Sequence, residues 1–173
     1  MKLNEMFLAE VDREGTLTAR VLENVPIGRN EWQPHPKSMP LGRLASLVAL
    51  MPEWLTMMID RDEFDLNPPE PKPADRSSFG RTFNTPAELV AALQNGIEAA
   101  KKKLAATTDD HLLKNWQLKF GGKTVSERPR YVFLRETINH LAHHRGQLTV
   151  YLRLNDAKVP AVYGPSADEQ RFD

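Results

Sequence analysis

Apolar side chains recur with a helical period in four stretches of the chain, separated by proline-rich or glycine-rich segments. The predicted helices run from about Asn4 to Asn24, from Pro40 to about Asp60, from Pro86 to about Ala106, and from Ser126 or Arg128 to Asn155. Four amphipathic helices of roughly 20 to 27 residues close most simply into a four-helix bundle about 30 Å long. The predicted fold class is therefore all-α, in a single domain over residues 1–173.

The segments around these helices add detail to the predicted bundle. Pro52 removes a backbone donor inside the second helix and should kink it. Residues 66–83 contain four prolines, which predicts a long crossover between the second and third helices. Thr85 and Glu88 form a capping-box pattern at the start of the third helix. Apolar and polar residues alternate over 116–120 before two glycines, which indicates a short hairpin, and an extended tail after Asn155 should pack across the bundle.

Composition removes several classes of function. Lys and Arg number 23 and Asp and Glu number 23, so no long-range field would hold a polyanion, and we expect no nucleic-acid partner. The chain has no cysteine, so any metal or acid–base chemistry falls to His, Asp and Glu. No stretch approaches the ~20 apolar residues of a membrane span, and the N-terminus lacks the apolar core of a signal peptide. We therefore expect no membrane partner and a cytoplasmic location.

Three of the five histidines lie within five residues of the last predicted helix, at 140, 143 and 144. His140 and His144 are four residues apart, so their imidazoles should meet on one face, the spacing by which two helical histidines bind a divalent cation. His143 should point away from that pair. The same face carries Phe133 and Thr137 beside the apolar seam, which predicts a partly dry, concave site. The alternative is that the histidines are solvated or satisfied in the core.

Two carboxylates interrupt the apolar face of the first predicted helix. Glu10 and Glu14 are four residues apart, and inward-facing carboxylates could face the histidines across the bundle as a general base or as metal ligands. Glu14 is the candidate catalytic residue. The alternative is a solvated helix face. Residues 109–111 have the pattern of a helix start or a turn, and no role is assigned to them.

These segments also resemble a known family. Residues 140–148 (HLAHHRGQL), 151–155 (YLRLN), 159–169 (VPAVYGPSADE) and 32–45 (WQPHPKSMPLGRLA) resemble the DinB-like (DinB/YfiT) family of bacterial four-helix-bundle proteins. The resemblance implies a bundle with a long crossover between its second and third helices, and often a homodimer. It also implies a divalent metal, such as Zn, Ni or Mn, held by three histidines.

One of those three expected histidines is missing. Two of the implied metal ligands map onto His140 and His144, and the third should fall at position 47, where this chain has Leu47. Leucine cannot bind a metal, so the resemblance implies a degenerate site with an affinity well below that of a three-histidine site.

The resemblance, together with Leu47 in place of the third histidine, leaves two hypotheses for the function. Related proteins include transferases and isomerases that use the low-molecular-weight thiols bacillithiol, mycothiol or glutathione, so one hypothesis is a metal-assisted, thiol-dependent enzyme. Such a metal would favour the thiolate, which a cysteine-free chain cannot supply itself. The alternative, favoured by Leu47, is a non-catalytic bundle that binds a small molecule or a protein partner.

Overall fold

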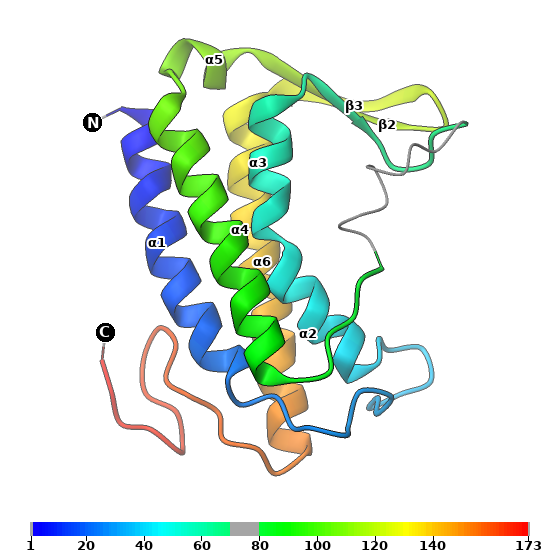
Figure 1. Cartoon of the computed structure of the whole chain (residues 1–173), viewed down its shortest axis with the longest axis vertical. Coiled ribbons are helices and arrows are strands. Elements are labelled where there is room, and N and C mark those ends of the chain that lie inside the picture. Colours follow the sequence, from blue (N-terminus) through cyan, green and yellow to red (C-terminus); the bar gives the residue numbers. More distant parts are fainter. Residues whose placement is uncertain (1, 70–79, 173) are drawn as a thin grey trace.

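Long helices running along one axis make up most of the molecule (Figure 1). The computed structural model describes residues 2–69 and 80–172. Its helices are α1 (Leu3–Leu22), α2 (Leu41–Leu50), α3 (Pro52–Asp60), α4 (Pro86–Ala106), the short α5 (Asp109–Leu113) and α6 (Arg130–Leu154). Within these residues α1, α4, α6 and the consecutive helices α2 and α3 pack against one another, and the fold is mostly helical.

Local sequence signals account for several helix boundaries. At the start of α4, the Thr85 hydroxyl accepts from the Glu88 amide at 3.2 Å, and the Glu88 carboxylate accepts from the Thr85 amide at 3.0 Å, which confirms the capping box. The second predicted helix is divided where Pro52 was expected to kink it, with Met51 between α2 and α3. The helix α2 slants away from the line of α3, so the chain bends at this point (Figure 1).

A small sheet makes the all-α prediction too narrow. Strands β2 (Asn115–Phe120) and β3 (Lys123–Pro129) form the expected hairpin, and β1 (Glu63–Asp65) pairs with β2 in parallel. The turn uses two glycines, at positions 121 and 122, with φ of 60° and 79°, a region that disfavours other residues. The Asp65 carboxylate accepts from both glycine amides, so it ties β1 to this turn.

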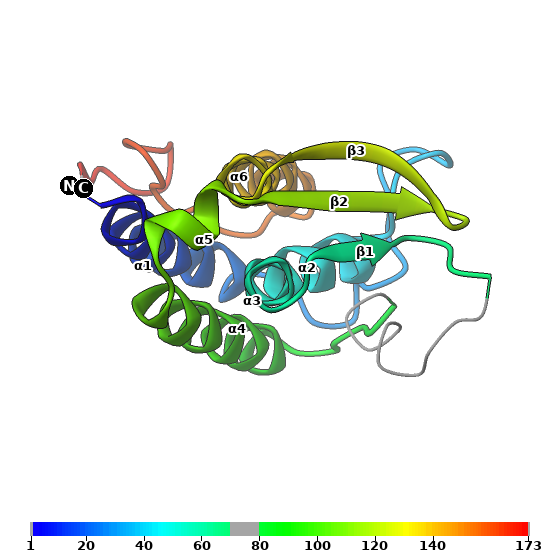
Figure 2. The ribbon, with the colours of Figure 1, turned by 90° about the horizontal axis from the view of Figure 1, so that it is seen from above.

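The sheet also corrects the start of the last helix. Residues 123–129 belong to β3, and α6 begins at Arg130 rather than at Ser126 or Arg128. Strand pairing with β2 holds this segment extended, because Trp116 pairs with Arg128 and Asn115 with Pro129. Seen from above, the sheet projects sideways from the ends of α3 and α6 (Figure 2).

Large apolar side chains from every long helix form one core. It includes Phe7, Leu44, Leu93, Leu134 and Leu148, all at most 1% exposed. The helices α1 and α4 approach closely at Gly15, where a Cβ would lie 2.9 Å from Ile97 Cδ1. The core therefore depends on a small residue at this crossing.

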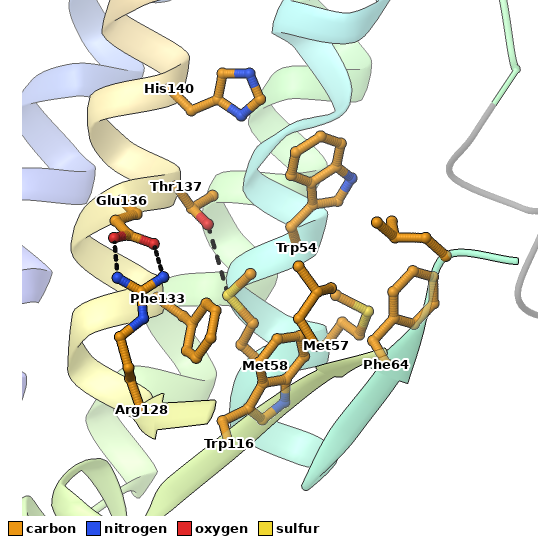
Figure 3. Close-up of a pocket in the computed structure, with 12 residues that line it drawn as sticks. Trp54, Met57, Met58, Phe64, Trp116, Arg128, Phe133, Glu136, Thr137 and His140 are labelled. Carbon is orange, nitrogen blue, oxygen red and sulfur yellow. Dashed lines mark hydrogen bonds and ion pairs between the residues drawn. The ribbon is translucent and has the colours of Figure 1, made fainter. Parts of the chain in front are cut away.

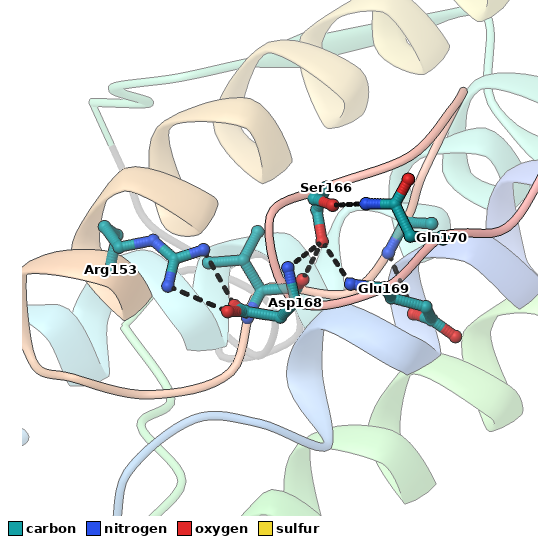
Figure 4. Close-up of polar contacts among 7 residues, drawn as sticks. Arg153, Ser166, Asp168, Glu169 and Gln170 are labelled. Atoms are coloured by element: carbon teal, nitrogen blue, oxygen red, sulfur yellow. Dashed lines mark hydrogen bonds and ion pairs between the residues drawn. The ribbon is translucent and has the colours of Figure 1, made fainter.

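The chain after α6 folds back over the helices without a helix or strand between residues 155 and 172. The Asp168 carboxylate accepts from the Val159 amide at 2.8 Å and pairs with Arg153 (Figure 4). Glu169 pairs with Arg20 of α1 at 2.8 Å. The predicted extended tail is thus confirmed and is anchored to α1 and α6.

The predicted crossover over 66–83 lies partly outside the described residues. Its described parts, 66–69 and 80–83, contain no helix or strand, and residues 70–79 are outside the description. None of the helices described here is long and apolar enough to cross a bilayer.

Candidate functional site

A cavity of about 320 Å³ lies between α3, the first half of α6 and the sheet (Figure 3). Its wall is mostly apolar and includes Trp54, Met57 and Met58 of α3, Phe64 of β1, Trp116 and Leu118 of β2, and Phe133 of α6. Phe133 packs edge-on against Trp116, with ring centroids 4.7 Å apart. This volume and lining are typical of a small-molecule site. Phe133 and Thr137 belong to the face on which the sequence predicted a concave site.

Few polar groups reach this cavity, and the charged ones are paired. Arg128 binds the Glu136 carboxylate through both terminal nitrogens, at 2.5 and 2.8 Å, and its guanidinium lies over the Phe133 ring. Among residues 2–69 and 80–172, the Thr137 hydroxyl donates only to the thioether of Met58, at 3.5 Å. A thioether is a weak acceptor, so the Thr137 hydroxyl keeps its capacity to bind a ligand.

One imidazole, that of His140, lies at the rim of the cavity, and two more lie next to it along α6. The His140 ring lies beside Trp54, with centroids 5.9 Å apart, and lines the cavity. The His144 ring is 4.5 Å from the His140 ring, so the two predicted partners are neighbours. His143 does not point as far away as expected, since its ring centroid is 5.1 Å from that of His144.

Gln147 fixes the tautomers of two of these rings. Its amide oxygen lies 2.7 Å from His144 Nδ1, and its amide nitrogen lies 3.0 Å from His143 Nε2. The amide nitrogen can only donate, so His143 Nε2 accepts, and His144 Nδ1 carries the proton that the amide oxygen accepts. In its neutral form His144 therefore has an unprotonated Nε2, the atom that would bind a cation or accept a hydrogen bond.

His140 is biased toward its neutral form. Partial burial, followed by the neighbouring charges of His144 and His143, lowers the pKa of His140 below its usual 6.5. A neutral imidazole offers a lone pair at neutral pH. His140 thus has the protonation state of a metal ligand or a hydrogen-bond acceptor.

The structure brings Glu14 to an arginine of α6. Arg145 Nη2 lies 2.7 Å from Glu14 Oε2, and both residues are buried. The Tyr163 hydroxyl donates to the same carboxylate at 2.8 Å, and burial followed by this bond raises the pKa of Tyr163. Within residues 2–69 and 80–172, no hydrogen bond joins Glu14 to a histidine. The prediction that Glu14 faces the histidines is therefore wrong, and Glu14 forms a buried ion pair with Arg145 instead.

Glu10 has a similar partner in a wetter place. Its carboxylate pairs with Arg135 of α6, and the two side chains are 30% and 50% exposed. The two glutamates of α1 therefore bind two arginines of α6, one pair near solvent and one in the core.

The residues present do not fit a three-ligand metal centre. Leu47 is half-buried on α2 and packs against the core. In the described parts of the chain, no group of three or more His, Asp or Glu side chains is placed to hold a metal ion. His140 and His144 are two ligands, and this number corresponds to weak binding.

Sequence reasoning missed the groups that hold the cavity wall in place. Arg130 is fully buried, and its guanidinium donates to the carbonyls of Met58 and Arg61, at 2.7 and 3.0 Å. His111, to which no role was assigned, lies 2.9 Å from the Ile59 carbonyl. Both side chains satisfy carbonyls at the end of α3, the helix that carries most of the apolar wall. No local pattern around Arg130 or His111 indicates this role.

Known proteins share this fold and this sequence pattern. A model of the DinB family matches residues 2–171. The chain belongs to the DinB family. Among solved structures, a DinB-like protein of Bacillus cereus is 25% identical with a TM-score of 0.69, and the match covers 92% of this chain and 97% of that one. The DinB-like protein YjoA of Bacillus subtilis shares the fold, with 14% identity and a TM-score of 0.65. That match covers 96% of this chain and 99% of YjoA.

A curated relative matches over a shorter length. YrdA of Bacillus subtilis, named as an uncharacterised protein, is 31% identical over 103 residues, or 54% of this DinB protein and 59% of YrdA. The match therefore spans less than two thirds of that relative. Its name assigns no activity.

Proposed function

We propose that this DinB protein binds a small, largely apolar molecule in the cavity between α3, α6 and the sheet. The observation that carries the proposal is the 320 Å³ apolar cavity that reaches His140. Burial of apolar surface would supply most of the binding free energy, at about 25 cal/mol for each Å² removed from water. This is the non-catalytic alternative that the sequence left open.

Two polar groups would orient such a ligand. The Thr137 hydroxyl has only a thioether partner, and neutral His140 stands at the rim. Both can donate or accept one hydrogen bond, which favours a ligand with a single polar group over a highly polar one.

Filling the cavity tests the proposal. Leu118 is half-buried and lines the cavity, whereas Val125, in the same hairpin, is 59% exposed and lies outside it. With the neutral fluorescent probe N-phenyl-1-naphthylamine, we expect Leu118→Trp to raise Kd at least tenfold and Val125→Trp to leave it unchanged. Circular dichroism checks that both variants fold. A folded Leu118→Trp variant that binds the probe as tightly as the wild type overturns the proposal.

A weak divalent-cation site is a second candidate, supported by the adjacent rings of His140 and His144. Two imidazoles support binding of Zn, Ni or Mn well below the affinity of a three-ligand site. Elemental analysis of protein purified without a histidine tag should then show less than one ion per chain. One tightly held ion per chain overturns this reading.

The thiol-dependent transferase stays a prediction of the family resemblance. Its test is incubation of the protein with glutathione, bacillithiol or mycothiol and the electrophile 1-chloro-2,4-dinitrobenzene. Turnover above the protein-free rate supports an enzyme, and its absence with all three thiols favours the ligand-binding function. The homodimer is likewise a prediction, which light scattering tests.

A further inference from the structure

A second hollow, of about 390 Å³, lies beside α2. It is bounded by Arg43, Leu47 and Leu50 of α2, by Met39 before that helix, and by residues 80–82. Two arginines, at 43 and 81, line it, whereas the arginine that lines the apolar cavity, Arg128, is paired with Glu136 of the same lining. The two hollows therefore differ in chemistry, one apolar and one cationic.

Both hollows lie along one face of α2 and α3. Arg43, Leu47, Leu50, Trp54 and Met57 follow a spacing of four, three, four and three residues, which places them in one row along a helix. The first three line the cationic hollow, and the last two line the apolar cavity. At 1.5 Å per residue, the eleven residues from Arg43 to Trp54 correspond to about 16 Å along the helix.

The charge of the cationic hollow comes from Arg43. Arg81 is neutralised by Glu53 of α3, with which it forms an ion pair. Arg43 is exposed and makes no hydrogen bond or ion pair with residues 2–69 or 80–172. Its guanidinium offers five donors and a permanent positive charge at the end of the row.

We infer that the ligand of this protein is an amphipathic anion, whose apolar part occupies the cavity at Trp54 and Met57 and whose anionic group binds Arg43. The inference rests on the proposed function, because it assumes that the apolar cavity binds a ligand. A carboxylate on an extended apolar chain has this combination of chemistry and length. Leu47 lies between Arg43 and Trp54 in this row, is half-buried and apolar, and would contact that chain.

A matched pair of ligands tests the inference on the full-length protein. Dodecanoate and dodecan-1-ol have the same chain and differ in charge, and each is titrated against bound N-phenyl-1-naphthylamine. We expect Arg43→Gln to weaken dodecanoate binding about twofold to fivefold, the effect of losing one ion pair at an exposed site. We expect dodecan-1-ol to bind this variant as it binds the wild type. Added salt should weaken dodecanoate binding only.

Lys102→Gln is the control for net charge, because Lys102 is exposed on α4 and lines neither hollow. Equal loss of dodecanoate binding in both variants overturns the inference, since it would reflect overall charge. If both ligands displace the probe and Arg43→Gln changes neither, the inference is overturned and the proposed function stands. If neither ligand displaces the bound probe, the inference is overturned, and the proposed function is decided separately by the Leu118→Trp and Val125→Trp variants.

Discussion

Replacing Glu14 by glutamine removes one charge from the buried pair with Arg145 while keeping the shape of the side chain. Arg145 is 1% exposed and donates to the Glu14 carbonyl, to Thr18 Oγ1 and to the Tyr163 hydroxyl, besides its ion pair with Glu14. The variant leaves this guanidinium in the core without a counter-charge. We expect a loss of about 3–5 kcal/mol in the free energy of unfolding, the range for breaking one partner of a buried ion pair.

The same helix offers a matched control. Glu10→Gln removes the same charge one turn earlier from a pair with Arg135 whose side chains are 30% and 50% exposed. For such a pair we expect a loss of less than about 1 kcal/mol. Urea denaturation followed by circular dichroism measures both variants, with equal denaturant slopes required for the comparison.

A double variant separates the pair from its surroundings. Arg145→Met together with Glu14→Gln removes both charges, so its cost should be smaller than the sum of the two single costs. If Glu14→Gln loses less than 1 kcal/mol but weakens probe binding, the structural role of Glu14 is refuted. Its candidacy as a site residue would then be restored.

Three further predictions concern Gly15, Leu47 and His140. Gly15→Ala should destabilise the protein by up to about 2 kcal/mol, because its Cβ would lie 2.9 Å from Ile97 Cδ1 and the cost of overpacking, about 1–3 kcal/mol, exceeds the ~1 kcal/mol gained in helix propensity. Gly146→Ala, on an open stretch of α6, should stabilise the protein by up to about 1 kcal/mol in the same urea assay. A Gly15→Ala variant stabilised as much as Gly146→Ala contradicts the close helix contact. Leu47→His should raise zinc affinity at least tenfold in isothermal titration, and an unchanged affinity would show that position 47 does not face His140 and His144. An NMR titration should place the pKa of His140 below 6.5. Between that lowered pKa and pH 6.5, the unfolded state binds more protons at His140 than the folded state does. The stability that His140 contributes is therefore present above pH 6.5 and is lost as the pH falls through this window. A measured pKa at or above 6.5 contradicts the burial argument.

Local patterns predicted the helices well because their signals lie within a few residues. The capping box at Thr85 and the proline at position 52 act on neighbouring backbone groups, and both had the expected effect. The alternation before Gly121 likewise predicted the hairpin. By contrast, β1 has three residues and pairs with a strand more than fifty residues away, so no local pattern marks it.

The site was predictable only in part, for the same reason. A spacing of four residues brought His140 and His144 together. The partner of Glu14 depends on how α1 turns against α6, which sequence spacing does not determine, and the partner is Arg145. The apolar cavity joins residues of α3, α6 and each of the strands β1, β2 and β3, so it exists only after the sheet has docked.

A crystal structure of the protein with N-phenyl-1-naphthylamine would show directly whether the cavity between α3, α6 and the sheet binds an apolar ligand. We expect the naphthyl ring between Trp54 and Phe133, within the cavity that both residues line. A ring bound on another surface, with this cavity filled only by water, would contradict it.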